Sequence, residues 1–266
     1  MKVRAIARNT FSALLRNKLI ILFCAGFACV VLLMLTPMLM MKSMAKTLSA
    51  GQTEGMVLSM VTGVMTLVSG FGSLLAIWAS ADSVTSEIKS GTVLAVMARP
   101  VRRWEFLLGK FLGVQMLMAI YVIAMLALSY LLVWLGGQQL RSSPLLMIIY
   151  PMIRYAVYSA LAILLVTVMH PVVAFGCGLI VAVLASMVSP AAGHSVFPEA
   201  IRTALYVVLP STGLLSEERF LSLTQTTLKD TPLTEHLIAL GYGLDYALVC
   251  FLLAVLLFRK RALARE

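Results

Sequence analysis

Long apolar runs are the feature that most constrains what this chain can fold into. A helix needs about 20 consecutive apolar residues to cross the roughly 30 Å hydrocarbon core of a bilayer. Hydrophobic residues make up 61% of the 266 residues, charged residues only 12%, and the mean hydropathy is +0.99. The sequence therefore predicts an all-α integral membrane protein with six transmembrane helices. These are expected over Leu19–Met41, Val57–Ala81, Phe111–Leu135, Leu145–Met169, Val172–Val188 and Leu237–Phe258.

The same pattern argues against two other architectures. No run shows the alternation of apolar and polar residues that a membrane β-barrel needs, so a helical bundle is the spanning structure that remains. The connections between the runs are short, so we expect one transmembrane domain over residues 1-266 and no separate soluble domain. Val172–Val188 is a short run that contains Gly176 and Gly178, so its boundaries are the least defined.

Basic residues are distributed unevenly along the chain. The 21 Lys and Arg residues exceed the 11 Asp and Glu residues, which gives a net charge of +10. Most of them lie before the first run, between the second and third runs, and after the last run. The positive-inside rule then places both termini and residues 82–110 in the cytoplasm, as expected of a multi-pass protein of the bacterial inner membrane. Orientation and attraction to anionic lipid explain this charge, so we expect membrane lipid and no nucleic acid as a partner.

Residues 1–18 precede the first run and have an amphipathic pattern. Val3 and Ile6 fall on the apolar face of a helix, and the arginines of this segment fall elsewhere. A basic amphipathic helix of this kind lies on a membrane surface, so we expect an interfacial helix on the inner leaflet. The adjacent polar residues Asn9 and Thr10 are expected to interrupt it.

The segment 82–110 is polar and charged between two apolar runs, so it does not lie in hydrocarbon. A helix is expected to continue from Asp82 to Lys89 and to break at Gly91, where a glycine permits a left-handed helix end. Glu105 then lies in the first turn of the next helix, where a carboxylate complements the positive end of the helix dipole. The result is a helix–break–helix hairpin, which indicates a docking surface for a soluble partner.

The order of residues in this hairpin resembles the signature loop of type-2 ABC exporter permeases. The branch that it resembles contains the gliding-motility, sodium-efflux and nitrous-oxide-reductase maturation permeases. The resemblance is carried by Glu87, by Gly91-Thr92, by Arg99-Pro100-Val101-Arg102-Arg103 and by Gly109-Lys110. Arg102 stands where this family usually has a serine. The amphipathic N-terminus, the six runs and the long segment before the last run also agree, so the resemblance covers nearly the whole chain.

The resemblance implies a permease subunit that is not itself an enzyme. Such permeases pair as a homodimer or with a close relative, and they bind two copies of a cytoplasmic ABC ATPase that holds ATP and Mg. The chain would then need no cofactor of its own, which agrees with the absence of a Walker lysine loop from its sequence. Export is the direction of transport that the resemblance implies.

The resemblance also implies that the hairpin couples the permease to the ATPase. Glu87 and Arg99 would contact the ATPase, and Gly91 and Thr92 would shape the turn. The same coupling set includes Pro100, Arg102, Arg103, Gly109 and Lys110. For Arg102, Arg103 and Lys110, contact with lipid phosphates is the alternative. The simpler interpretation of the whole hairpin is a basic loop that only fixes the topology of the membrane helices.

Two charged residues fall inside predicted spans, Arg154 in the fourth and Asp245 in the sixth. A charge in hydrocarbon is costly unless it is paired or close to an interface. Both residues lie in the outer part of their spans, so one hypothesis is an Arg154–Asp245 ion pair that locks the two helices together. Snorkelling of Arg154 to the outer headgroups is the alternative.

The segment 189–236 is expected outside the cytoplasm. Residues 199–209 have a helical pattern that ends at Pro210, and the apolar character of this stretch favours a short helix that dips back into the membrane. A surface segment with two small helices is the alternative.

Other functional classes lack their sequence signals. Cys24, Cys29, Cys177 and Cys250 all lie in spans without metal-ligand spacing, so we expect packing residues and no metal. The spans contain no clustered catalytic groups, which argues against a membrane enzyme. A secondary transporter or channel subunit not driven by ATP stays the alternative function, although midplane carboxylates and internal repeats are missing. Small residues four apart, such as Gly109 with Gly113, predict close helix packing within the chain, and a dimer face is the alternative.

Overall fold

The computed structural model describes residues 2–44, 50–89, 102–135, 143–188, 209–210, 213–215 and 233–260. These residues form helices joined by short turns, and no strand occurs among them. The helices are α1 (Lys2–Leu15), α2 (Lys18–Met44), α3 (Ala50–Lys89), α5 (Arg103–Leu135), α6 (Pro144–Val168), α7 (Pro171–Val188) and α9 (Leu233–Lys260). The all-α prediction is confirmed. Gly91, Thr92, Arg99, Pro100 and most of 189–236, with residues 199–208 of the predicted re-entrant helix, lie outside the described residues.

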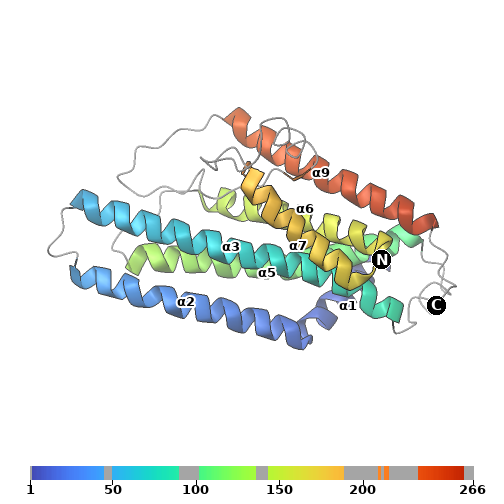
Figure 1. Cartoon of the computed structure of the whole chain (residues 1–266), viewed down its shortest axis with the longest axis horizontal. Helices are drawn as coiled ribbons and strands as arrows, with labels where there is room; N and C mark the ends of the chain where they lie inside the picture. The colour runs from blue at the N-terminus through green and yellow to red at the C-terminus, as the bar shows by residue number, and fades with distance from the viewer. Residues whose placement is uncertain are drawn as a thin grey trace.

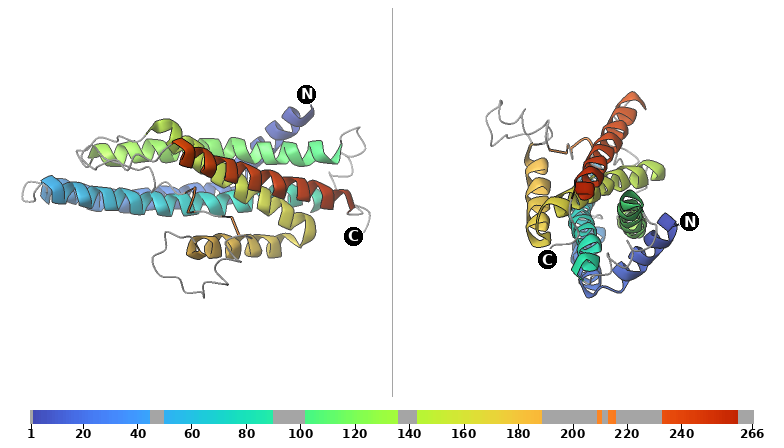
Figure 2. Two further views of the ribbon diagram at one scale, coloured as in Figure 1. Left: turned by 90° about the horizontal axis from the view of Figure 1, so that it is seen from above. Right: turned by 90° about the vertical axis from the view of Figure 1, so that its right-hand side faces the viewer.

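The helices form an elongated bundle in which α2, α3 and α5 run side by side and α9 lies on the opposite flank (Figure 1). The end-on view in Figure 2 places α6 between these two groups and α7 at the edge of the bundle. The helix α6 packs against α3, α5, α7 and α9, so it is the central helix. Its fully buried side chains include Tyr155, which belongs to a cluster with Leu75 and Met118.

Helices occupy all six predicted runs. Among the described residues, four helices are long and apolar enough to cross a membrane, namely α3, α5, α6 and α9. The helix α7 is a shorter apolar helix, described over Pro171–Ala185, and α1 with the start of α2 would make a fifth span only if the bent pair is taken as one. The structure therefore supports four to five candidate spans where the sequence predicted six.

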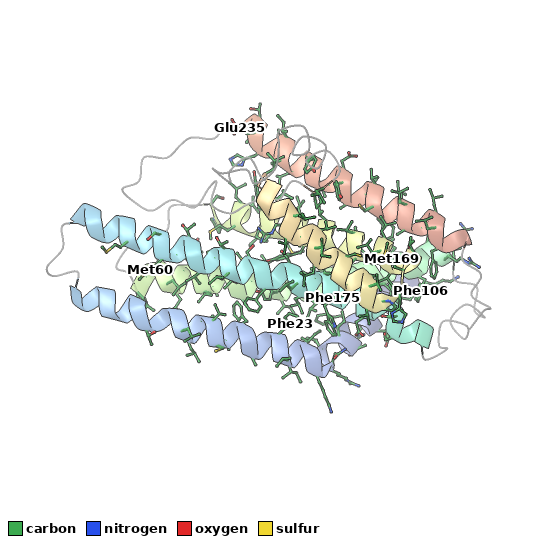
Figure 3. The ribbon with its side chains drawn as sticks, in the orientation of Figure 1. Phe23, Met60, Phe106, Met169, Phe175 and Glu235 are labelled. Atoms are coloured by element: carbon green, nitrogen blue, oxygen red, sulfur yellow. The ribbon has the colours of Figure 1, made fainter. Side chains whose placement is uncertain are left out.

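Several helix ends meet at one end of the bundle. Figure 3 shows Phe106, at the start of α5, and Met169, at the α6–α7 turn, toward one end, whereas Glu235, at the start of α9, lies well away from that end. The turn is short because Pro171 begins α7, where the missing N–H of a proline costs nothing, and the His170 carbonyl accepts the N–H of Ala174 at 2.9 Å. The start of α1 and the end of α9 lie at this same end (Figure 1).

The N-terminal helix does not break where the sequence predicted. The helix α1 continues through Asn9 and Thr10, and the chain bends by 64° only between α1 and α2. Thr10 is buried against α5, so tertiary packing outweighs the weak helix propensity of the two polar residues. At the bend the Asn17 carbonyl accepts the N–H of Ile20 at 3.1 Å and so begins α2, a position that asparagine favours.

Two glycines of α5 provide the surface on which α1 packs. A Cβ added at Gly113 would lie 2.7 Å from Thr10 Cβ and 2.8 Å from the carbonyl oxygen of Ala7. A Cβ at Gly109 would lie 2.6 Å from Ile6 Cγ2. Only glycine permits so close an approach of two helices. The predicted packing within the chain at this pair is confirmed, and its partner is α1.

Candidate functional site

A small cavity lies where α1, α3 and α5 meet. Its volume is about 220 Å³, and its lining comes from Thr10, Ala13, Leu14, Asn17, Asp82, Ser83, Ser86 and Lys110. Most of these residues are polar, although the surrounding helices are predominantly apolar. The cavity therefore gathers side chains from the N-terminal helix and from both ends of the hairpin segment 82–110.

Two residues that line the cavity are joined by a hydrogen bond between distant parts of the chain. Asn17 Nδ2 donates to Asp82 Oδ2 at 2.9 Å. Asn17 lies at the bend between α1 and α2, and Asp82 lies on α3 where the hairpin segment begins. The bond therefore ties the N-terminal bend to the start of that segment.

Lys110 also lines the cavity and is only 3% exposed. Its Nζ lies 5.6 Å from the centroid of the Phe106 ring, a distance at which the ring face attracts the cation. Gly109, the neighbour of Lys110, is buried under α1. Any part that these two residues play in coupling would thus be exerted through α1 and not by direct contact with a soluble partner.

The end of the hairpin segment is tied to the helices that follow it. The backbone N–H of Arg102 donates to Glu105 Oε2 at 2.8 Å, so Glu105 caps the start of α5 in the first turn, as predicted. Arg103 Nη1 donates to the carbonyl oxygen of Phe258 at 3.0 Å, and the Phe106 and Phe258 rings stack with centroids 6.1 Å apart. These contacts fix the start of α5 to the end of α9.

The structure places some of the predicted coupling residues. Glu87 lies in the last turn of α3, which confirms that the helix continues beyond Asp82. Arg102 is exposed and Arg103 is half-buried. The two ends of the hairpin segment thus lie at one end of the bundle, whereas its central residues are outside the described part of the chain.

The family model for ABC-2 family transporter proteins matches residues 4–263, which is nearly the whole chain. The chain belongs to the ABC-2 transporter family. It is therefore a type-2 ABC permease, the membrane subunit of an ABC transporter, as its resemblance had indicated. Among curated proteins, none matches the chain. The branch within the family stays a prediction.

The ABC-2 permease holds Arg154 over one aromatic ring. The Arg154 guanidinium carbon lies 5.7 Å from the centroid of the Tyr155 ring, and Arg154 itself is half-buried on α6. Asp245 is exposed on α9. The stacking on Tyr155 was not predicted from the sequence, and an ion pair between Arg154 and Asp245 stays a prediction.

Sequence reasoning missed Asn17 and Thr10 as lining residues of this cavity in the ABC-2 permease. Asn17 carries a usable signal, because it is an uncharged polar residue two positions before the first apolar run. Thr10 carries none, since its role follows from the contact between α1 and Gly113. Within the described ranges, no group of three or more His, Cys, Asp or Glu side chains is placed to hold a metal ion.

Proposed function

We infer that this ABC-2 permease is the dimeric membrane subunit of an ATP-driven exporter. Its six helices would cross the inner membrane with both termini in the cytoplasm, and a second permease copy would complete the translocation path. Two copies of an ABC ATPase would bind the hairpin segment 82–110 and supply ATP and Mg. Family membership supports the ABC partner, and the distribution of basic residues supports the orientation.

The observation that carries this proposal is the anchoring of both ends of the hairpin segment. At its start, Asp82 accepts a hydrogen bond from Asn17, and at its end Arg103 donates one to the Phe258 carbonyl. A movement of the hairpin would therefore reach the α1–α2 bend through one bond and α9 through the other. A segment that only fixed the membrane topology would not need a link to a distant helix at each end.

A mechanism follows from this arrangement. ATP binding would favour the conformation in which the two ATPase copies are close together, and the hairpins bound to them would shift. Because a ligand shifts a conformational equilibrium only through its different affinities for the two states, the contact between hairpin and ATPase must differ between them. Glu87 and Arg99 are the residues that we assign to this contact, and Gly91 and Thr92 would shape the turn.

The first experiment is co-purification of the tagged permease from native membranes in mild detergent, followed by mass spectrometry. We expect a cytoplasmic ABC ATPase in stoichiometric amount, and we expect Glu87→Lys to remove it. Glu235→Lys is the matched control, because Glu235 is exposed at the start of α9, away from the end of the bundle where Phe106 lies. Retention of the ATPase by Glu87→Lys would refute the assigned contact.

A second measurement separates coupling from assembly. In proteoliposomes with the ATPase, we expect Glu87→Ala and Arg99→Ala to insert normally and to hydrolyse ATP without transport. Normal transport by both variants would refute the coupling role. Recovery of the permease with no ATPase at all would favour a secondary transporter or channel subunit.

A further inference from the structure

The membrane part of α9 carries one charged residue. Asp245 is the only charged residue in the apolar run Leu237–Phe258, and it is exposed. At a rise of about 1.5 Å per residue, Asp245 lies about 12 Å along the helix from Leu237 and about 20 Å from Phe258. Both distances reach well into a hydrocarbon core that is roughly 30 Å thick. The carboxylate is therefore expected within the membrane and not among the headgroups.

The contacts of α9 show which of its sides Asp245 occupies. A Cβ added at Gly243 would overlap with Ile153 of α6, and Ala239 and Ala247 are buried on the same side of α9. Two residues along a helix correspond to a rotation of about 200°, so Asp245 lies on the opposite side from Gly243. Among the four candidate spans of the described chain, α9 is the least buried, at 22% against 44–61%. The Asp245 side of α9 thus faces away from α6 and outward from the described bundle.

A carboxylate on an outward side of a membrane helix needs a polar or charged environment. Ionisable residues within membrane helices almost always face the interior of a bundle or a water-filled cavity, because lipid does not solvate the charge. Contact of Asp245 with acyl chains is therefore unfavourable. A second copy packed tightly on this side would bring the same carboxylate from each copy to one symmetric interface, where like charges repel. A water-filled path avoids both costs.

The residues around Asp245 leave room for a bulky group and offer it apolar contacts. Gly241 is exposed one turn before Asp245, and no described atom lies within 4 Å of a Cβ placed there. Further along the same side, Leu248 is 57% exposed and Leu252 is 52% exposed. The Asp245 side thus combines a single negative charge, a notch without a side chain and an apolar surface. A lipophilic cation is the chemical class that matches all three.

We propose that the Asp245 side of α9 lines the translocation path and binds a lipophilic cation as cargo. Asp245 supplies the opposite charge, Gly241 admits the bulk beside it, and Leu248 and Leu252 contact the apolar part of the cargo. This inference rests on the proposed transport function and names the class of its substrate. Binding can be measured on the permease without the ATPase, so a failure of this proposal and a failure of the ATPase co-purification are separate results.

The test measures binding of two probe ions to the full-length permease in phosphatidylcholine nanodiscs. Tetraphenylphosphonium and tetraphenylborate have nearly the same size and shape and opposite charges, so they separate the effect of charge from that of apolar contact. Equilibrium dialysis against empty nanodiscs of the same lipid corrects for the share of each ion that dissolves in lipid. We expect saturable binding of tetraphenylphosphonium to the permease and about tenfold weaker binding of tetraphenylborate.

Substitutions on this outward side identify the residues that bind the cation. We expect Asp245→Asn to weaken tetraphenylphosphonium binding about tenfold and Asp245→Glu to preserve most of it, because only glutamate retains the charge. Glu235→Gln is the matched control, since Glu235 is an exposed acid of α9 outside the apolar run. We expect Gly241→Leu to weaken binding about fivefold by filling the notch. Gly26→Leu on α2 is its control, because no described atom lies within 4 Å of a Cβ there either.

Each contrary result overturns the proposal. Equal saturable binding of the two ions would show that apolar contact, and not charge, selects the ligand. Unchanged tetraphenylphosphonium affinity in Asp245→Asn would assign the carboxylate to another partner, either Arg154 in the predicted ion pair or a second copy of the chain. No saturable binding of tetraphenylphosphonium would exclude a lipophilic cation as cargo.

Discussion

Arg103 and Phe258 join two helices that are far apart in the sequence. Arg103 Nη1 donates to the Phe258 carbonyl oxygen at 3.0 Å, at the point where α9 approaches its end. The last carbonyl groups of a helix lack partners within the helix, and a cation near that end also complements its dipole. The stacked rings of Phe106 and Phe258 add an apolar contact at the same junction. The start of α5 and the end of α9 are thus expected to move as one unit.

The first prediction concerns this junction. We expect Arg103→Ala to lower the stability of the purified protein by about 1–2 kcal/mol, because the Phe258 carbonyl loses a charged donor. Thermal unfolding in detergent measures the loss. Arg102→Ala is the control, since Arg102 is exposed and its side chain should contribute little. Equal losses in the two variants would exclude a specific role for the bond.

The second prediction concerns the close approach of α1 and α5. We expect Gly113→Ala to destabilise the protein by about 1–3 kcal/mol, because the added methyl overlaps with Thr10 and the Ala7 carbonyl. Gly63→Ala is the matched control, since nothing lies within 4 Å of a Cβ at that position. There the better helix propensity of alanine is expected to stabilise the protein by about 0.5–1 kcal/mol. Unfolding curves of the two variants should shift in opposite directions, and a shift in the same direction would refute the packing argument.

The third prediction concerns the hydrogen bond between α6 and α9. The Tyr150 hydroxyl and His236 Nδ1 are 2.7 Å apart, and Tyr150 is buried. A double-mutant cycle with Tyr150→Phe and His236→Ala is expected to show a coupling energy of about 0.5–1.5 kcal/mol. The same cycle with Tyr130→Phe, at an exposed tyrosine, should give none. Additive losses at Tyr150 and His236 would show that the bond contributes no net stability.

The fourth prediction concerns the environment of Arg154. A guanidinium stacks on an aromatic ring better than an ammonium does, so we expect Arg154→Lys to destabilise the protein. With Tyr155→Leu already present, the same change should cost less. An equal cost in both backgrounds would exclude the stack.

The charge swap Arg154→Asp with Asp245→Arg tests the predicted ion pair in addition. Rescue of the two single variants by the swap would support the pair, and additive damage would remove it.

Part of the candidate site could be predicted from local sequence. Glu105 was expected in the first turn of a helix, and it caps α5 there, because a carboxylate three residues after the capping position satisfies a free backbone N–H. Gly109 and Gly113 were expected in close packing because small residues four apart form a shallow surface on a helix. Neither pattern indicates which element makes the contact, so the packing partner α1 was not predicted.

The sequence by itself determined that the chain is a helical membrane protein with a charged hairpin segment of the ABC-2 type, because apolar run length and motif order are local properties. Only the tertiary structure decided that α1 continues through Asn9 and Thr10 and that Lys110 is buried at 3% exposure. These features depend on contacts between residues distant in sequence. The sequence of a helix shows whether one of its faces is small, polar or apolar. Which helix packs on that face depends on how all the helices pack together.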